Sequence, residues 1–413
     1  MSMFYSQQPT NGSLNGSHSA SSGGSLPADS GASNGFPGYA GTVSNALLSL
    51  GLDLSRESLV NPITTIRAAT GAAPGFTPRK AWKAPDDLPP TDVAAYLARW
   101  DPQTRFYMLI TEMVSGLEFS ATTDGAAIHC QDSAHQRQML LAMTRPPRKI
   151  FDAQMAKVFA RATERNDRTA EILTQVQPQF AYWAAICNLH PNRNAWTIEL
   201  MTAALHFSML VCQRLKHILA CPRPVEYSSL IQPIILTPAY GTFPMGHATE
   251  AYMFAGTMRA LLERAGGPGA AAHADTLDAA GTGDQLDLIA RRISDNRVIS
   301  GVHFPIDGPG GFVLADTLCA YLIARLDNGA VTQGRLFEGK KVPGAWDDDP
   351  KQDYTGKSAF ARLGARIAPP PSPILTYMFE RAQAEFAYQA PPPASPAPVP
   401  ARAFARARAG VAK

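Results

Sequence analysis

Three short segments of this chain carry cationic, histidine and carboxylate side chains at spacings that suit the binding of an oxyanion. The first segment runs from Lys216 to Pro224 and has a second cation at Arg223. Seven residues are close to two helical turns, so these two side chains can project in the same direction. Two neighbouring cations repel each other unless an anion lies between them. The alternative is that both snorkel at a helix end, where cations also suit the helix dipole.

The second segment, 240–249, places a glycine and a histidine where a helix is expected to begin. Gly246 lets an anion approach the backbone closely, and the free N–H groups of a first helical turn favour negative charge. His247 can take a proton from a reacting oxygen or donate one at neutral pH. The alternative is a helix-terminal histidine with a structural hydrogen bond.

The third segment, 296–307, contains an arginine, a histidine and an aspartate. Arg297 can donate two hydrogen bonds from its planar guanidinium to a tetrahedral oxyanion. His303 can direct a ring nitrogen at the central atom of that ion. Asp307 can orient the other ring nitrogen and so fix the tautomer. The alternative is an ordinary Arg–Asp pair between helices.

Taken together, the three segments resemble the superfamily of type 2 phosphatidic acid phosphatases (PAP2) and vanadium-dependent haloperoxidases. The resemblance rests on three patterns in a fixed order: Lys-x6-Arg-Pro, Pro-x-Gly-His and Arg-x5-His-x3-Asp. They lie within 216–307, under a quarter of the chain. The matching residues are Lys216, Arg223, Pro224, Pro244, Gly246, His247, Arg297, His303 and Asp307.

The resemblance implies a role for each of these side chains around one pocket for phosphate or its analogue vanadate. The predicted oxyanion-binding residues are Lys216, Arg223, Arg297 and the N–H of Gly246. His303 would be the axial ligand of vanadium, or the nucleophile that takes a phosphoryl group. His247 would be the acid and base, and Asp307 would orient His303. Tyr240 falls where haloperoxidases have an aromatic or histidine side chain beside the metal, although core packing explains it equally well.

Two reactions of the superfamily and one non-catalytic role are compatible with these residues. The main prediction is a haloperoxidase-like oxidoreductase, in which bound vanadate takes up hydrogen peroxide, oxidises a halide and leads to halogenation of a small organic substrate. It is favoured because no set of membrane spans and no signal peptide is apparent, and because a long helical stretch precedes Lys216. The close alternative is a PAP2-type acid phosphatase that hydrolyses a phosphate ester through a phosphohistidine. The third possibility is a descendant that binds an oxyanion without catalysis.

Two positions depart from the superfamily pattern. Met245 occupies a position that is usually serine, and Asn296 stands where serine usually precedes the third-segment arginine. A hydrogen bond to a charged group contributes about 1.5–3 kcal/mol, so loss of the hydroxyl at 245 predicts anion binding ten- to a hundredfold weaker. A thioether beside an oxidant is also readily converted to the sulfoxide, which counts against the oxidase.

The elements expected to position these residues are helices. Apolar residues recur at three-to-four spacing, and no alternating apolar run next to an Asn-Gly or Asp-Gly turn was recognised. The predicted fold class is therefore all-α, a helical bundle of the PAP2 and vanadium haloperoxidase type. The predicted helices are 102–116, 149–165, 167–188, 194–221, 247–265, 284–299, 310–326 and 373–389.

Composition limits what else the chain can be. Of its 413 residues 45% are hydrophobic, enough for a large core. Residues 1–45 are rich in Ser, Gly and Asn, and 390–413 in Pro, Ala and Arg, so both are predicted to be disordered tails around one domain, 46–389. Within 37–389 there are equal numbers of basic and acidic residues, which argues against a nucleic-acid partner.

Cysteine usage and hydropathy give a cellular expectation. The chain has 5 cysteines and no Cys-x-x-Cys pair, which favours a reducing compartment over a disulfide scaffold. No basic and apolar leader and no continuous apolar span was recognised, so a cytoplasmic protein without a membrane span is predicted. The sequence leaves an oligomer possible.

Overall fold

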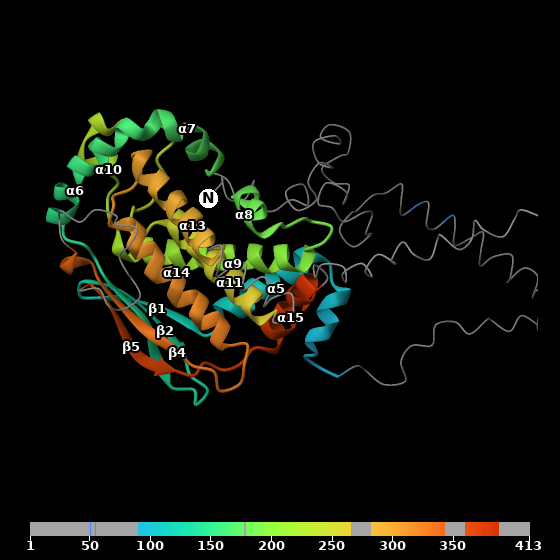
Figure 1. Cartoon of the computed structure of the whole chain (residues 1–413). Coiled ribbons are helices and arrows are strands. Elements are labelled where there is room, and N and C mark those ends of the chain that lie inside the picture. Colours follow the sequence, from blue (N-terminus) through green and yellow to red (C-terminus); the bar gives the residue numbers. More distant parts are fainter. Residues whose placement is uncertain are drawn as a thin grey trace, which may run out of the picture. The chain divides into compact units, whose positions relative to one another are not determined.

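The computed structural model describes residues 90–176, 179–265, 282–342 and 360–387, together with Leu50 and Leu54 (Figure 1). The chain divides into two compact units, Met1–Arg105 and Phe106–Lys413. The tails predicted from composition lie outside the described residues, so they and the domain limits stay predictions.

The described part of the first unit holds a short 3-10 helix and the start of a longer α-helix. These are η2 (Ala94–Arg99) and α5 (Pro102–Val114). Asp101 caps α5, because its carboxylate accepts the backbone N–H of Thr104 at 2.8 Å and the hydroxyl of the same residue at 2.7 Å. The helix predicted over 102–116 is thus α5, and it begins at Pro102.

The second unit consists largely of helices. They are α6 (Arg148–Arg161), α7 (Arg165–Thr174), α8 (Phe180–Cys187), α9 (Ala195–Leu219), α10 (Pro224–Tyr227), α11 (Gly246–Arg264), α13 (Thr282–Ile299), α14 (Asp307–Ala324) and α15 (Pro373–Ala387). Short 3-10 helices lie at Ala162–Glu164, Ser229–Ile231 and Gly339–Lys341. The predicted helix 167–188 is two helices, α7 and α8, and the other helical ranges agree to within a few residues.

The prediction of an all-α fold is wrong, because the second unit also contains a five-stranded mixed sheet. Its strands are β1 (Leu117–Thr122), β2 (Gly125–Gln131), β3 (Arg137–Thr144), β4 (Thr332–Glu338) and β5 (Ala361–Ile367). They lie in the order β1-β2-β3-β4-β5; the β3–β4 pair is parallel and the other pairs are antiparallel. The fold is therefore a mixture of helices and sheet.

The β1–β2 hairpin shows why the strands were missed. Thr122 pairs with Gly125 across the two-residue turn Thr123-Asp124, and β1 alternates apolar and polar residues. An alternating run beside an Asp-Gly pair is therefore present, contrary to the prediction. In β2, Ala126, Ala127 and Ile128 are all buried, so the strand lacks the apolar–polar alternation by which strands are recognised.

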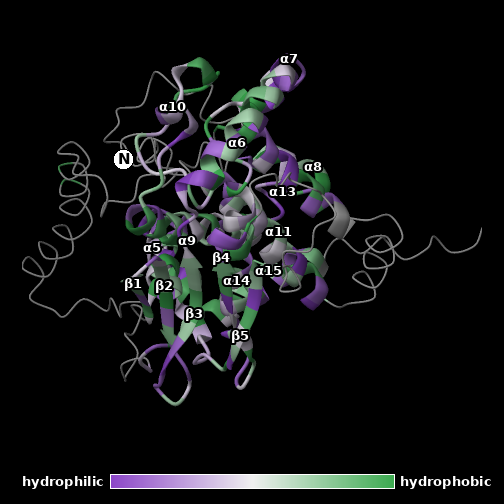
Figure 2. Ribbon diagram, turned by 90° about the vertical axis from the view of Figure 1, so that its left-hand side faces the viewer, coloured by the Kyte–Doolittle hydropathy of each residue, from purple (hydrophilic) through white to green (hydrophobic). Residues whose placement is uncertain are grey.

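Helix α11 lies at the centre of the second unit and contacts α9, α13, α14 and α15. A side chain at Gly311 would place its Cβ 2.6 Å from the carbonyl oxygen of Met245, so glycine permits α14 to approach the start of α11. Both views place the strands at one end of this unit and α6 and α7 at the other (Figures 1 and 2). The start of α11 is thereby surrounded by the ends of other helices, and the candidate site is built there.

Helix α9 carries Lys216, the start of the first segment, and is unusually apolar. Within the described residues, Ala195–Tyr227 is the one helical stretch long and apolar enough to cross a membrane by length and composition, and 61% of its most apolar window is buried. It packs against α11, α15, β1 and β2. At its start, the carboxylate of Glu385 accepts the backbone N–H groups of Trp196 and Thr197, both at 2.8 Å. No membrane span was predicted, but this helical stretch passes the test of length and composition. The cytoplasmic location stays a prediction.

Candidate functional site

Lys216 and Arg223 are brought together by a bend rather than by a continuous helix. Helix α9 ends at Leu219, and Ala220 adopts a left-handed backbone conformation with φ 46°. Both cations are buried, with 1% and 2% of their surface exposed. Lys216 Nζ donates to the carbonyl oxygens of Gly241 and Thr242 at 2.9 and 2.7 Å. The two side chains therefore converge on the loop that precedes α11 through this bend, and the prediction that they share one continuous helix is wrong in that respect.

Arg223 connects this loop to the third segment. Its Nε donates to the carbonyl oxygen of Tyr240 at 2.9 Å, and its Nη1 donates to the carbonyl oxygen of Val302 at 2.8 Å. The same Nη1 lies 2.9 Å from Nε2 of His303. The Tyr240 ring lies 5.5 Å from Lys216 Nζ and 5.3 Å from the Arg223 guanidinium carbon, within the range of cation–π attraction.

The imidazole of His303 is held in one tautomer. Its Nδ1 lies 2.8 Å from Asp307 Oδ2, and that oxygen also accepts the Thr242 hydroxyl at 2.5 Å and the Phe304 N–H at 2.9 Å. Arginine can only donate, so Nε2 facing Arg223 must carry the lone pair, and Nδ1 carries the proton towards Asp307. Burial, with the nearby cations, holds the pKa of His303 well below its usual value. The ring is therefore neutral, with a nucleophilic nitrogen directed at the cations.

Arg297 lies near the end of α13 and is fully buried. Its Nη2 donates to the carbonyl oxygen of Ile172 at 2.9 Å and lies 3.5 Å from Gln175 Oε1. Its Nε and Nη1 have no hydrogen-bond partner among the described residues. Burial lowers the pKa of Arg297 to about 10. Lys216, Arg223 and Arg297 are called the cation cluster below.

Gly246 and His247 open α11 beside this cluster. A methyl group on Gly246 would lie 4.0 Å from Lys216 Cε, which places the first-turn N–H groups of α11 next to that lysine. His247 Nε2 lies 3.0 Å from the carbonyl oxygen of Gln175. Burial, followed by the charge of Arg297, lowers the pKa of His247 to about 3. Positive charge from the cluster therefore reaches both histidines.

The cluster carries more positive charge than the carboxylates around it balance. Burial lowers the pKa of Lys216 to about 8, and the charge of Arg223 lowers it further while Asp307 opposes the shift. Burial raises the pKa of Asp307 itself to about 6. Both shifts report charges that have lost water without gaining full pairing. A bound polyanion would restore the charge pairing that buried Lys216 lacks, which makes this region a candidate oxyanion site.

Two residues that the sequence analysis missed belong to the same region. Glu250 lies one turn after His247 on α11, and burial raises its pKa to about 7 although Lys216 and Arg297 oppose that shift. An acidic residue within the apolar run of α11 was the signal for it. Gln175 follows α7 directly and had no such signal, because it lies far from the three segments in sequence.

The two departures from the superfamily pattern have specific neighbours. Met245 is fully buried, and its sulfur accepts a hydrogen bond from the Ser294 hydroxyl at 3.3 Å. The side-chain amide of Asn296 donates to Gln175 Oε1 at 2.8 Å and to Glu171 Oε2 at 3.1 Å. Position 245 thus offers no donor to an anion, and position 296 holds the side chain of Gln175.

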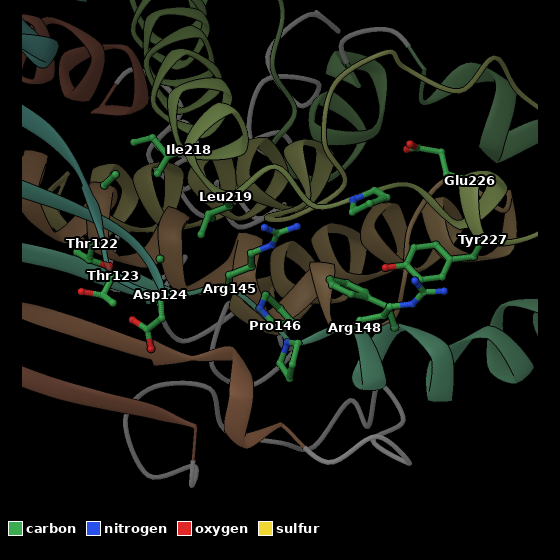
Figure 3. A pocket seen from close by; sticks show the side chains of 15 residues that line it. Thr122, Thr123, Asp124, Arg145, Pro146, Arg148, Ile218, Leu219, Glu226 and Tyr227 are labelled. Carbon is green, nitrogen blue, oxygen red and sulfur yellow. The ribbon is translucent and has the colours of Figure 1, made fainter.

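A separate cavity of about 760 Å³ lies between the β1–β2 turn, the start of α6 and the end of α9 (Figure 3). Arg145 is one of its lining residues and donates to the carbonyl oxygen of Ala220 at 3.0 Å. None of the predicted site residues lines this cavity. Glu226 connects it to the site, because the Glu226 carboxylate lines the cavity and accepts the backbone N–H of Arg223 at 2.7 Å.

The described residues favour an anion over a metal cation. No group of three or more His, Cys, Asp or Glu side chains within them is placed to hold a metal ion. The unpartnered guanidinium nitrogens of Arg297 are hydrogen-bond donors, which match the oxygens of a phosphate or vanadate ion.

Comparison with known proteins gives a distant structural likeness. No family model matches the chain, and no curated protein matches it. Among the solved structures that match is a transmembrane PAP2-type phosphatidylglycerolphosphate phosphatase from Bacillus subtilis, with 18% sequence identity and a TM-score of 0.33. The match covers 54% of this chain and 93% of that one. At this identity and TM-score it does not establish a family, so function has to be inferred from the site itself.

Proposed function

We propose that this chain is a PAP2-type phosphatase that hydrolyses phosphate monoesters through a phosphorylated His303. The observation that carries the proposal is the state of that ring. Asp307 holds its Nδ1 at 2.8 Å, so the lone pair of Nε2 faces the buried cation cluster. A neutral nucleophile beside three cations is what attack on a dianionic phosphate requires.

Substrate binding would use the hydrogen-bond donors that surround this nitrogen. Arg297 would give its unpartnered Nε and Nη1 to phosphate oxygens, and Lys216 has a third N–H beyond the two that it donates to carbonyls. Arg223 Nη1 would exchange the His303 ring for a phosphate oxygen, which frees Nε2 to attack. The first-turn N–H groups of α11 at Gly246 would complete the set.

The reaction would proceed in two displacements. In the first, Nε2 of His303 forms a bond to phosphorus, the ester P–O bond breaks, and the leaving oxygen takes a proton from His247. In the second, His247 takes a proton from water as the oxygen of that water attacks phosphorus, the P–N bond breaks and inorganic phosphate leaves. The low pKa of free His247, about 3, means that the substrate dianion must raise this pKa before His247 can act as an acid.

Vanadium-dependent halide oxidation, the main prediction from the sequence, would use the same cluster. Lys216, Arg223, Arg297 and His303 would hold vanadate as they would hold phosphate, and bound vanadate would supply peroxide activation. Oxidisable sulfur lies next to these donors, however. Met245 directly precedes Gly246, and the Cys212 thiol lies 3.7 Å from the carbonyl oxygen of Pro244. Both groups react with peroxide and hypohalous acids, so the site favours hydrolysis.

A paired assay on one preparation tests the proposal. We expect hydrolysis of an aryl phosphate that orthovanadate inhibits, and loss of that turnover in His303→Ala and in His247→Ala. The exposed His217 on α9 provides the matched control, and His217→Ala should hydrolyse the ester at the parent rate. Turnover that survives both site substitutions would refute the phosphatase. Bromination of a phenol dye with vanadate, peroxide and bromide, without ester hydrolysis, would establish the oxidase instead.

A further inference from the structure

Gln175 places both its backbone and its side chain against the candidate site. The residue is fully buried. Its carbonyl oxygen accepts hydrogen bonds from His247 Nε2 at 3.0 Å and from Gln179 Nε2 at 3.1 Å. Its side-chain oxygen lies 3.5 Å from Arg297 Nη2. It therefore contacts one residue proposed for proton transfer and one proposed for oxyanion binding.

The orientation of the Gln175 amide is fixed by its neighbour. Asn296 accepts a hydrogen bond from Arg168 Nη1 at 3.2 Å through Oδ1, and its Nδ2 donates to Glu171 at 3.1 Å. These contacts leave Nδ2 as the atom that faces Gln175, at 2.8 Å. Because Nδ2 is a donor, the atom of Gln175 that faces it must be the oxygen. The NH₂ group of Gln175 is consequently directed away from Asn296.

That NH₂ group has no partner. Gln175 Nε2 is buried without a hydrogen bond among the described residues, and the same is true of Nε and Nη1 of the adjacent Arg297. Leaving buried donors unpaired destabilises a folded protein. Three such nitrogens lie on two side chains that contact each other, so one ligand with several hydrogen-bond acceptors could satisfy them. A tetrahedral oxyanion has such acceptor oxygens.

The two departures from the superfamily pattern fit together on this geometry. Met245 removes a hydroxyl donor, and its sulfur lies instead against Ser294. Asn296 replaces a serine with a side chain long enough to hold the Gln175 oxygen. One substitution takes a donor from the site, and the other orients a new one.

We infer that the side-chain amide of Gln175 is an oxyanion-binding donor that takes the place of the missing serine hydroxyl, and that Asn296 is the residue that positions it. The inference rests on the proposed function, since it names a further residue of the same phosphate site. It also explains how a chain with Met245 retains a complete set of donors.

The test measures binding of inorganic phosphate to the full chain by equilibrium dialysis. Gln175→Met removes the donor with little change in volume, and it should raise the Kd by about ten- to a hundredfold. Asn296→Ala should raise the Kd by a smaller factor, because the amide remains but is no longer oriented. Gln154→Met is the matched control: Gln154 is also fully buried with an unpartnered Nε2, and its oxygen accepts the Ile306 N–H at 3.0 Å. Its Kd should stay at the parent value.

A rescue experiment distinguishes a ligand contact from a structural effect. Met245→Ser restores the hydroxyl and should recover most of the lost affinity in the Gln175→Met background, while improving the parent much less. If Gln175→Met does not fold, Gln175→Glu keeps the size and the acceptor oxygen and should weaken phosphate binding as well. A parent that binds phosphate and a Gln175→Met protein with the same Kd would overturn this inference alone. A parent that binds no phosphate would overturn the proposed function with it.

Discussion

Two groups of buried or half-buried cations in this protein have opposite surroundings. The ion-pair network joins α6, α7 and α13, and each of its arginines faces a carboxylate. Its pairs are Arg161 with Glu164 and Asp295, Arg168 with Glu171, and Arg292 with Glu171. In the cation cluster, Lys216, Arg223 and Arg297 donate mainly to carbonyl oxygens and to the ring of His303.

The pKa values of the two groups reflect this difference. The hydrogen bonds that Arg292 donates to the Glu171 carboxylate raise the pKa of Arg292. Burial lowers the pKa of Lys216 to about 8 and that of Arg297 to about 10. Folding thus stabilises charge in the network and opposes it in the cluster. We infer that the ion pairs of the network stabilise the folded state. The buried charges of the cluster lower the stability of the folded state unless an anion binds to them.

Replacing one carboxylate beside each group is expected to give the largest difference, measured as kcat. Asp307→Asn leaves the size unchanged but no longer fixes the Nδ1–H tautomer of His303, so we expect kcat for aryl phosphate hydrolysis to fall by about 10²- to 10⁴-fold. Asp295→Asn in the network is the matched substitution and should leave kcat unchanged. Equal losses in the two variants, measured by steady-state kinetics, would show that Asp307 acts only through stability.

Removing an unpaired buried charge should make the protein more stable. Arg297→Met keeps a long apolar side chain and deletes two unpartnered nitrogens, so without phosphate the free energy of unfolding should rise by about 1–3 kcal/mol. The same variant should lose the added stability that phosphate gives the parent. Urea unfolding with and without phosphate measures both. A large destabilisation in phosphate-free buffer would mean that Arg297 is a structural residue.

The raised pKa of Glu250 predicts a specific dependence of stability on pH. Its folded pKa of about 7 exceeds the value of 4.5 for an isolated glutamate, so the folded state holds the proton more tightly. This contribution is complete below pH 4.5 and is lost as the pH rises through 7. Glu250→Gln should remove it, and the parent should then lose about 3 kcal/mol more than the variant across this range. Parallel curves for the two proteins in phosphate-free buffer would contradict the assignment.

A substitution in the ion-pair network is expected to have the smallest effect, a minor change in the free energy of unfolding. Arg292 is 46% exposed and Glu171 is 24% exposed in their pair. Arg292→Met should therefore lower the free energy of unfolding by only about 0.2–1 kcal/mol, and by less at high salt. A loss several times larger that persists in high salt would show that the pair behaves as a buried structural ion pair.

The contribution of sequence reasoning differs between site and fold. The sequence predicted that Asp307 orients the ring of His303, and the structure places their side chains in contact at 2.8 Å where α14 begins. Lys216 and Arg223 also meet, but through a bend at Ala220 that periodicity does not reveal.

The remaining features depend on long-range contacts. Strand β4 pairs in parallel with β3 from about 190 residues further along the chain, and the buried run of β2 hides its strand periodicity. Gln175 reaches the site only because α7 packs against α13. No local pattern in the sequence marks either contact.

Phosphate binding by matched arginine variants tests the central claim most directly. Equilibrium dialysis with labelled phosphate should give one site per parent chain, in competition with orthovanadate. Arg297→Met should bind about ten- to a hundredfold more weakly, and Arg292→Met should bind like the parent. No stoichiometric phosphate binding by the parent, or equal binding by both variants, would contradict the account of these buried cations as one oxyanion site.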